Sequence, residues 1–149
     1  MSPSPPPWRW RPRGRKLPGG RPIRSKAKLK AAEGRLIAFA KAYPGAWEDY
    51  PWEHTVMKVG KKVFVFFGGA ASPEHFSCTV KLPISAEMAL TLPYMSPAGH
   101  GLGKAGWVNA HLTDPGDIDE DTWRGWIDQS YRAIATKKLI RELDAAKAA

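Results

Sequence analysis

Cysteine is nearly absent from this chain of 149 residues, since Cys78 is its only one. A single cysteine cannot form an intrachain disulfide, which excludes a disulfide-stabilised secreted scaffold. No apolar run approaches the roughly 18 residues that a membrane helix needs, and no apolar stretch typical of a secretory signal follows the basic N-terminus. We therefore expect a soluble cytoplasmic protein without membrane contacts.

Acidic residues are missing from the first 30 positions, which hold ten of the 23 basic residues. Residues 31–149 carry 13 basic and 14 acidic side chains, a net charge of −1. The formal net charge of +9 therefore belongs to the N-terminal segment, which can attract phosphates without regard to sequence. The rest of the chain has to be judged on its own residues.

The N-terminal segment, residues 1–25, is rich in proline and has no apolar periodicity, so we expect a disordered basic tail followed by a single domain over 26–149. Its aromatic and cationic side chains alternate in a way that suits base stacking and phosphate contact, although such a charge run can also be simply solvated. The expected nucleic-acid contacts of the tail are Trp8, Arg9, Trp10, Arg11, Arg13, Arg15, Lys16, Arg21 and Arg24.

Apolar residues recur at three- and four-residue spacing over 26–42, which predicts an amphipathic helix with Ser25 as its N-cap. A short helix is expected over 86–92. A longer one starts near Asp119 with Trp123 and Trp126 on its apolar side, and a last one follows from Lys137.

Four segments rich in β-branched and aromatic residues predict strands: 54–59, 62–67, 75–82 and 107–112. The first two flank Gly60-Lys61, a hairpin signal. Alternation of apolar and polar residues in the third strand indicates a sheet with one buried face. The order helix, three strands, helix, strand or strands, helix predicts an α+β fold: an antiparallel sheet with helices packed on one face.

Three patterns resemble chemical motifs but lack the context that the chemistry needs. The GxGxxG string over 101–106 precedes a strand, whereas a dinucleotide site needs it at the start of a helix. Acidic residues over 117–121 suit a helix cap better than a calcium loop. The histidines show no metal-ligand spacing, and no nucleophile–base set stands out. We expect no catalytic residues, no metal and no cofactor, and hence no enzyme.

Basic and aromatic residues on and around the predicted strands could form a binding surface on the folded part. Trp107 shares a strand face with Asn109 and His111, so exposure is one interpretation and packing under a loop or helix is the other. The expected contacts on this face are Lys58, Lys61, Lys62, Lys81, Lys104 and Trp107.

Four short segments, taken in order, resemble the MmcQ/YjbR family of small bacterial proteins. They are Lys58-Val59-Gly60-Lys61-Lys62-Val63-Phe64, Val80-Lys81-Leu82-Pro83, Gly103-Lys104-Ala105-Gly106-Trp107-Val108 and Ile127-Asp128-Gln129-Ser130-Tyr131. The resemblance spans about residues 30 to 143. It implies an α+β fold similar to type III secretion chaperones or CyaY, and members are commonly labelled DNA-binding.

Two functions follow as hypotheses. The first is a non-catalytic DNA-binding accessory protein with weak, sequence-tolerant affinity, in which the basic tail supplies phosphate contacts. The alternative is a chaperone-like module that binds a protein partner and has no nucleic-acid role.

Overall fold

The computed structural model describes residues 21–71, 73–99 and 101–148. Helices and strands follow one another there as α1 Arg21–Lys41, β1 Ala46–Asp49, β2 Thr55–Val59, β3 Lys62–Phe67, β4 Phe76–Lys81, α2 Ala86–Ala89, β5 Met95–Pro97, β6 Trp107–Leu112, α3 Glu120–Ile134 and α4 Lys137–Ala148. Single 3₁₀ turns lie between them: η1 Pro51–Glu53, η2 Gly69–Ala71, η3 Leu102–Ala105 and η4 Pro115–Asp117.

The strands form one antiparallel sheet in the order β1-β2-β3-β4-β6-β5. A two-residue turn, Gly60-Lys61, joins β2 to β3, and Gly60 has a φ of 63°. This left-handed conformation costs glycine nothing and suits the twist of a tight hairpin. Because every neighbouring pair is antiparallel, the end of β2, the start of β3, the end of β4 and the start of β6 lie at the same end of the sheet.

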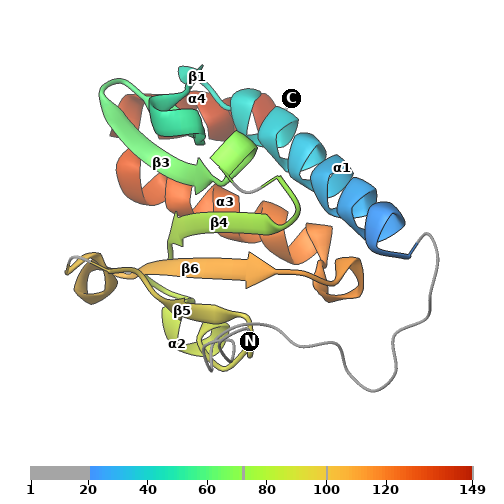
Figure 1. The fold of residues 1–149 in the computed structure, drawn as a ribbon. Helices are drawn as coiled ribbons and strands as arrows, with labels where there is room; N and C mark the ends of the chain where they lie inside the picture. Colours follow the sequence, from blue (N-terminus) through green and yellow to red (C-terminus); the bar gives the residue numbers. More distant parts are fainter. Residues whose placement is uncertain (1–20, 72, 100, 149) are drawn as a thin grey trace.

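Helices α1 and α3 pack together on one face of the sheet, while α2 lies beside its β5 edge (Figure 1). Alternation in β4 explains why this face is buried: Phe76, Cys78 and Val80 point into the core and the residues between them do not. Arg35 of α1 donates two hydrogen bonds, of 2.9 and 2.7 Å, to the carboxylate of Glu120 at the start of α3. The core therefore lies between the sheet and the α1–α3 pair.

A β-bulge interrupts the sheet where β3 leaves the hairpin. The register moves from Met57 opposite Val65 to Lys58 opposite Val63, so Phe64 has no direct partner on β2. Phe64 is fully buried against Tyr131 of α3, with ring centroids 5.2 Å apart. The bulge thus turns one more aromatic side chain toward the helices.

The α+β class predicted from the sequence is confirmed, and so is the antiparallel sheet with one helix-covered face. Strands over 62–67 and 107–112 lie where the pattern placed them, and the other two are shorter by one or two residues. The short edge strand β1 was not predicted, whereas β5 lies within 93–106, a segment that the sequence predicts to be a loop or a short edge piece. No helix of the described segments has the length and apolarity needed to cross a bilayer.

The expected start of the first helix was wrong. The α1 backbone is helical from Arg21, so Ser25 lies inside the helix and is not its N-cap. The apolar stripe itself is confirmed, because Leu29, Leu36 and Ala40 are almost completely buried. Residues 1–20 of the expected tail lie outside the described residues.

Candidate nucleic-acid interface

The strand register brings the lysines predicted for the folded face to one end of the sheet. They come from the end of β2, the hairpin turn, the start of β3, the end of β4 and the turn η3 before β6. This group, here called the lysine end, consists of Lys58, Lys61, Lys62, Lys81 and Lys104. In Figure 1 the β2–β3 hairpin and the turn before β6 both lie on the left, whereas α1 starts on the right.

The lysines of this group differ in their partners. Lys58 donates a hydrogen bond of 2.7 Å to Asp49, and its ammonium lies 5.1 Å from the ring centre of Trp47. In the part of the chain that the structure describes, the other four lysines form no ion pair. Their charges are therefore not neutralised by neighbouring carboxylates and can attract an anionic ligand.

Trp107 does not contribute an exposed ring to this end. It is only 8% exposed and packs edge-to-face on Phe66, with ring centroids 5.7 Å apart. The interpretation of Trp107 as an exposed side chain was therefore wrong, and the packed alternative is the one observed. The polar residues beside Trp107 in β6 suggested an exposed face, but Phe66 of β3 lies on the same face of the sheet and covers the ring.

Trp47 is the exposed tryptophan at the lysine end, and it was not among the predicted site residues. It lies opposite Lys58 in the β1–β2 ladder and is 44% exposed. Its indole Nε1 donates a hydrogen bond of 3.0 Å to the carbonyl oxygen of Gly60 in the hairpin turn. The ring is therefore fixed beside the turn that carries Lys61 and Lys62.

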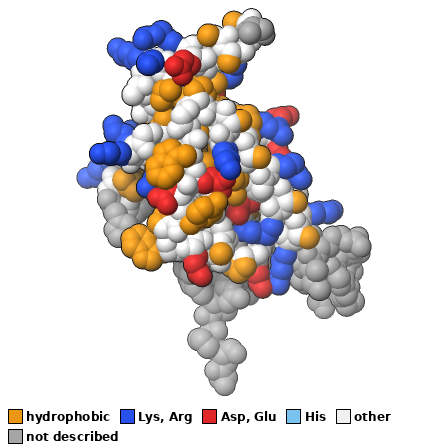
Figure 2. All heavy atoms as spheres, turned by 90° about the horizontal axis from the view of Figure 1, so that it is seen from above, with side chains coloured by type: hydrophobic (Ala, Val, Ile, Leu, Met, Phe, Trp, Pro, Cys, Tyr) orange, Lys and Arg blue, Asp and Glu red, His pale blue; other side chains and the backbone are white. Residues whose placement is uncertain are grey.

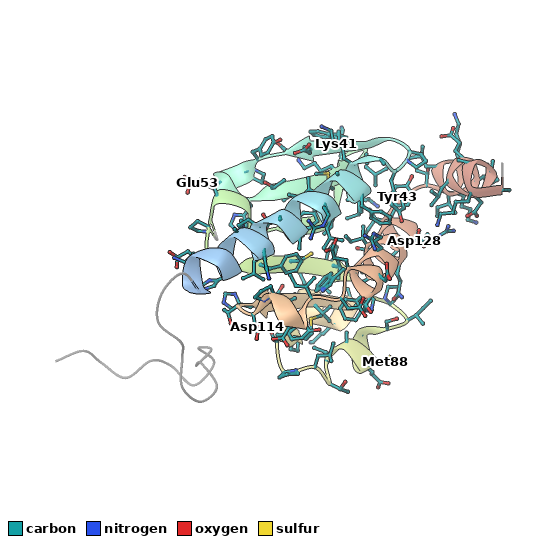
Figure 3. All side chains as sticks on the ribbon, turned by 90° about the vertical axis from the view of Figure 1, so that its right-hand side faces the viewer. Lys41, Tyr43, Glu53, Met88, Asp114 and Asp128 are labelled. Carbon is teal, nitrogen blue, oxygen red and sulfur yellow. The ribbon has the colours of Figure 1, made fainter. Side chains whose placement is uncertain are left out.

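Acidic residues gather at the opposite end of the sheet. Glu53 precedes β2, Glu74 precedes β4, and Asp114, Asp117 and Asp119 follow β6. The first turns of α1 lie at the same end, where Lys26 forms an ion pair of 2.7 Å with Glu74. Figure 3 shows Glu53 and Asp114 on either side of the start of this helix.

Only two of the tail residues predicted to contact nucleic acid fall within the described segments. Arg21 and Arg24 lie in the first turns of α1, and the remaining predicted contacts, Trp8 to Lys16, lie outside the described residues. The helix that carries the tail therefore begins at the acidic end, and the lysine end lies at the far end of the strands.

Among the described residues, groups with catalytic chemistry do not assemble into a recognisable site. Cys78 is buried, and burial raises the pKa of its thiol well above the usual value, with Glu33 adding to the effect. Ser77 and His111 lie 3.3 Å apart on the open sheet face, but the ring beside His111 is that of His75, not a carboxylate that could orient it. Burial lowers the pKa of His111, and His75 lowers it further. Among the described residues, no three His, Cys, Asp or Glu side chains are grouped for a metal ion.

Two of the rejected motifs have the structural roles expected of them. Asp119 caps α3 by accepting hydrogen bonds from the backbone N–H groups of Asp121 and Thr122. The glycine-rich string runs into the turn η3 and then into β6, so no helix N-terminus faces it.

The fold and the lysine end define a small α+β protein with an antiparallel sheet, helices on one face and a basic sheet end. The sequence profile of the YjbR family matches residues 41–133, more than half of the chain, and the chain belongs to this family. No curated protein matches the chain. A solved structure with a similar fold is protein DR2400 of Deinococcus radiodurans, described as a DUF419 domain. It is 21% identical, with a TM-score of 0.58 over 75% of this chain and 87% of that one.

Proposed function

We propose that this protein binds nucleic acid weakly and without sequence preference, through the lysine end together with the basic tail, and that it has no catalytic activity. One observation carries the proposal: the sheet register gathers four lysines, none of them ion-paired to a described residue, at one end of a domain whose overall charge is close to neutral. The single buried cysteine suits the reducing cytoplasm, where we place the protein.

The two ends of the sheet differ in how their charges are paired. Carboxylates at the acidic end lie beside the basic residues of the first turns of α1, whereas four lysines at the other end form no ion pair with a described residue and can attract phosphates. The lysine end would therefore turn toward the ligand. Phosphate contacts of this kind fix position but carry no base preference.

The test is a titration of fluorescein-labelled duplex DNA with the full-length protein at several salt concentrations. Charge reversal by Lys61→Glu with Lys62→Glu is expected to weaken binding and to reduce the slope of log K against log salt by about 1 for each lysine. The single variant Lys62→Glu is compared with Lys28→Glu as its matched control. Lys28 is an exposed lysine near the start of α1, at the acidic end, so its reversal changes the total charge equally but leaves the lysine end intact.

A loss from Lys28→Glu equal to that from Lys62→Glu would show that only the total charge matters. An unchanged slope in the double variant would remove the lysine end from the interface. Either result contradicts the proposed site.

Exposed apolar side chains favour a second function, the protein-interaction module. Ile84 and Met88, four residues apart around α2, are 85% and 76% exposed, an arrangement that suits contact with an apolar partner surface. If neither duplex nor single-stranded DNA binds at 50 mM salt, this function takes the place of the first.

A further inference from the structure

Trp47 has the properties of a base-stacking side chain. Its ring is 44% exposed, while the hydrogen bond from Nε1 to Gly60 and the ammonium group of Lys58 hold it in one orientation. A side chain that is already ordered loses little conformational entropy when a ligand stacks on it.

The surroundings of Trp47 supply the charge that a stacked nucleotide needs. Gly60, which accepts the indole hydrogen bond, is followed directly by Lys61 and Lys62. Their side chains are exposed and form no ion pair with any other described residue. An aromatic face beside cations that can follow a phosphate backbone is the arrangement used to bind single-stranded nucleic acid.

We propose that the lysine end selects single-stranded over duplex nucleic acid because Trp47 stacks on an unpaired base while Lys61 and Lys62 contact the adjoining phosphates. This inference rests on the proposed function and names its ligand class. Bases inside a duplex are already stacked and paired, so the ring gains nothing from them without the cost of pulling a base out of the helix.

Trp52 provides a matched comparison within the same chain. It is 90% exposed, more than Trp47, but it lies in η1 at the acidic end, next to Glu53. The carboxylate of Glu53 repels phosphates, which works against stacking on Trp52. Exposure alone would favour Trp52, whereas the proposal requires Trp47.

The experiment compares three ligands of equal length with the full-length protein at 50 mM salt: oligo-dT, an abasic oligomer with the same phosphates, and a duplex. Wild-type protein is expected to prefer oligo-dT to the abasic oligomer. Trp47→Ala should weaken oligo-dT binding at least about fivefold and leave abasic and duplex binding nearly unchanged. Trp47→Phe, which keeps an aromatic face, should retain most of the preference, and Trp52→Ala should retain all of it.

The outcomes separate the two claims. If Lys61→Glu with Lys62→Glu weakens all three ligands but Trp47→Ala leaves the ratio of oligo-dT to abasic affinity unchanged, the stacking role is wrong and the proposed function stands. An equal fall in that ratio for Trp52→Ala also overturns the stacking role. If the lysine variant changes no affinity, the proposed function fails. Melting temperatures of the variants show whether a loss comes from unfolding, and the ratio between ligands does not depend on the fraction of folded protein.

Discussion

The hydroxyl of Ser130 replaces a missing part of the sheet ladder. It donates a hydrogen bond to the carbonyl oxygen of Phe64 in β3 and accepts one of 2.9 Å from the backbone N–H of Lys81 in β4. Because of the bulge at Phe64, these two backbone groups do not form a ladder hydrogen bond with each other, and Ser130 is fully buried between them. A side chain of α3 thereby fixes the backbone of a lysine-end residue.

Ser130→Ala is expected to lower the free energy of unfolding by about 1–3 kcal/mol, because it leaves a buried carbonyl oxygen and a buried N–H without a partner. Urea denaturation measures the change. Ser96→Ala, at an exposed position of β5, is the control and should stay within about 0.5 kcal/mol of the parent protein. A change below that limit for Ser130→Ala would mean that water replaces the hydroxyl.

Single residues also show why the sequence predicted the candidate site only in part. Lys58, Lys62 and Lys81 lie in strands that the sequence predicted, whereas Lys61 and Lys104 lie in the turns before β3 and β6. Their position at one end of the sheet follows from the antiparallel pairing. Trp47 could not be separated from the other tryptophans by sequence, since its orientation depends on a hydrogen bond to Gly60 in a different strand pair. Trp107 was misjudged for the same kind of reason: Phe66, on a strand distant in sequence, covers it.

At the scale of elements, the C-terminal helix α4 packs on the core through Leu139, Ile140 and Leu143, and one carboxylate links it to α3 and to Tyr43. Asp128 of α3 accepts hydrogen bonds from Tyr43 at 2.7 Å, Arg132 at 2.8 Å and Lys147 of α4 at 3.3 Å. Arg132 also reaches Asp144 of α4 at 2.8 Å. Figure 3 shows Tyr43 and Asp128 next to each other where α1 ends beside α3.

This network makes the attachment of α4 depend on pH. Burial raises the pKa of Asp128, but the hydrogen bonds from Tyr43, Arg132 and Lys147 outweigh it, so the net pKa lies below the usual value of 3.8. A carboxyl group whose pKa is lower in the folded protein stabilises the fold above its unfolded pKa, and this contribution is lost as the pH falls. Asp128→Asn should therefore be less stable than the parent protein at pH 7, and the difference should shrink as the pH falls below about 4.

Thermal unfolding of both proteins between pH 2 and 7 measures the difference. Glu142→Gln serves as the control, because it changes an exposed carboxyl group of α4 that takes no part in the network. A stability difference between Asp128→Asn and its parent that stays constant down to pH 2 would show that the network acts through shape and not through charge.

Helices and strands differ in how clearly the sequence pattern predicts them. Strands β4 and β6 and helix α3 were predicted because burial on one side imposes a period that the sequence must keep, whereas β3 was predicted from its run of β-branched and aromatic residues. The edge strands β1 and β5 have four and three residues, too few for a period to emerge, and they contain acidic residues or proline. The start of α1 was misplaced because Ser25 satisfies the pattern of an N-cap although the helix continues through it.

On the scale of the whole molecule, the residues that flank the strands differ in charge between the two ends of the sheet. The lysine end and the acidic end lie at opposite ends of the sheet, and α1, which carries the basic N-terminal segment, begins at the acidic end. Figure 2, which views the molecule from the β1 side, shows hydrophobic side chains among both Lys/Arg and Asp/Glu groups, without a field of one sign over that face. Binding of an anion through the folded part therefore depends on which end meets it.

Twenty residues precede α1, and a fully extended chain of that length reaches on the order of 66 Å, whereas a six-residue strand spans about 20 Å. Length therefore does not prevent the tail from contacting nucleic acid that is bound at the lysine end. With about five of its seven cations engaged, the tail is expected to contribute roughly −4 to −5 to the slope of log K against log salt on duplex DNA.

Deletion of residues 1–20 removes five of those cations, Arg9, Arg11, Arg13, Arg15 and Lys16, and should flatten the slope by up to about 4.5 without lowering the melting temperature. The control, Trp8→Ala with Trp10→Ala, keeps every charge of the tail and should leave the duplex slope unchanged. Anisotropy titrations between 50 and 200 mM salt give both slopes. If the truncated protein binds the duplex as tightly as the full chain and with the same slope, the tail takes no part, and the lysines of the sheet end carry all of the phosphate contacts.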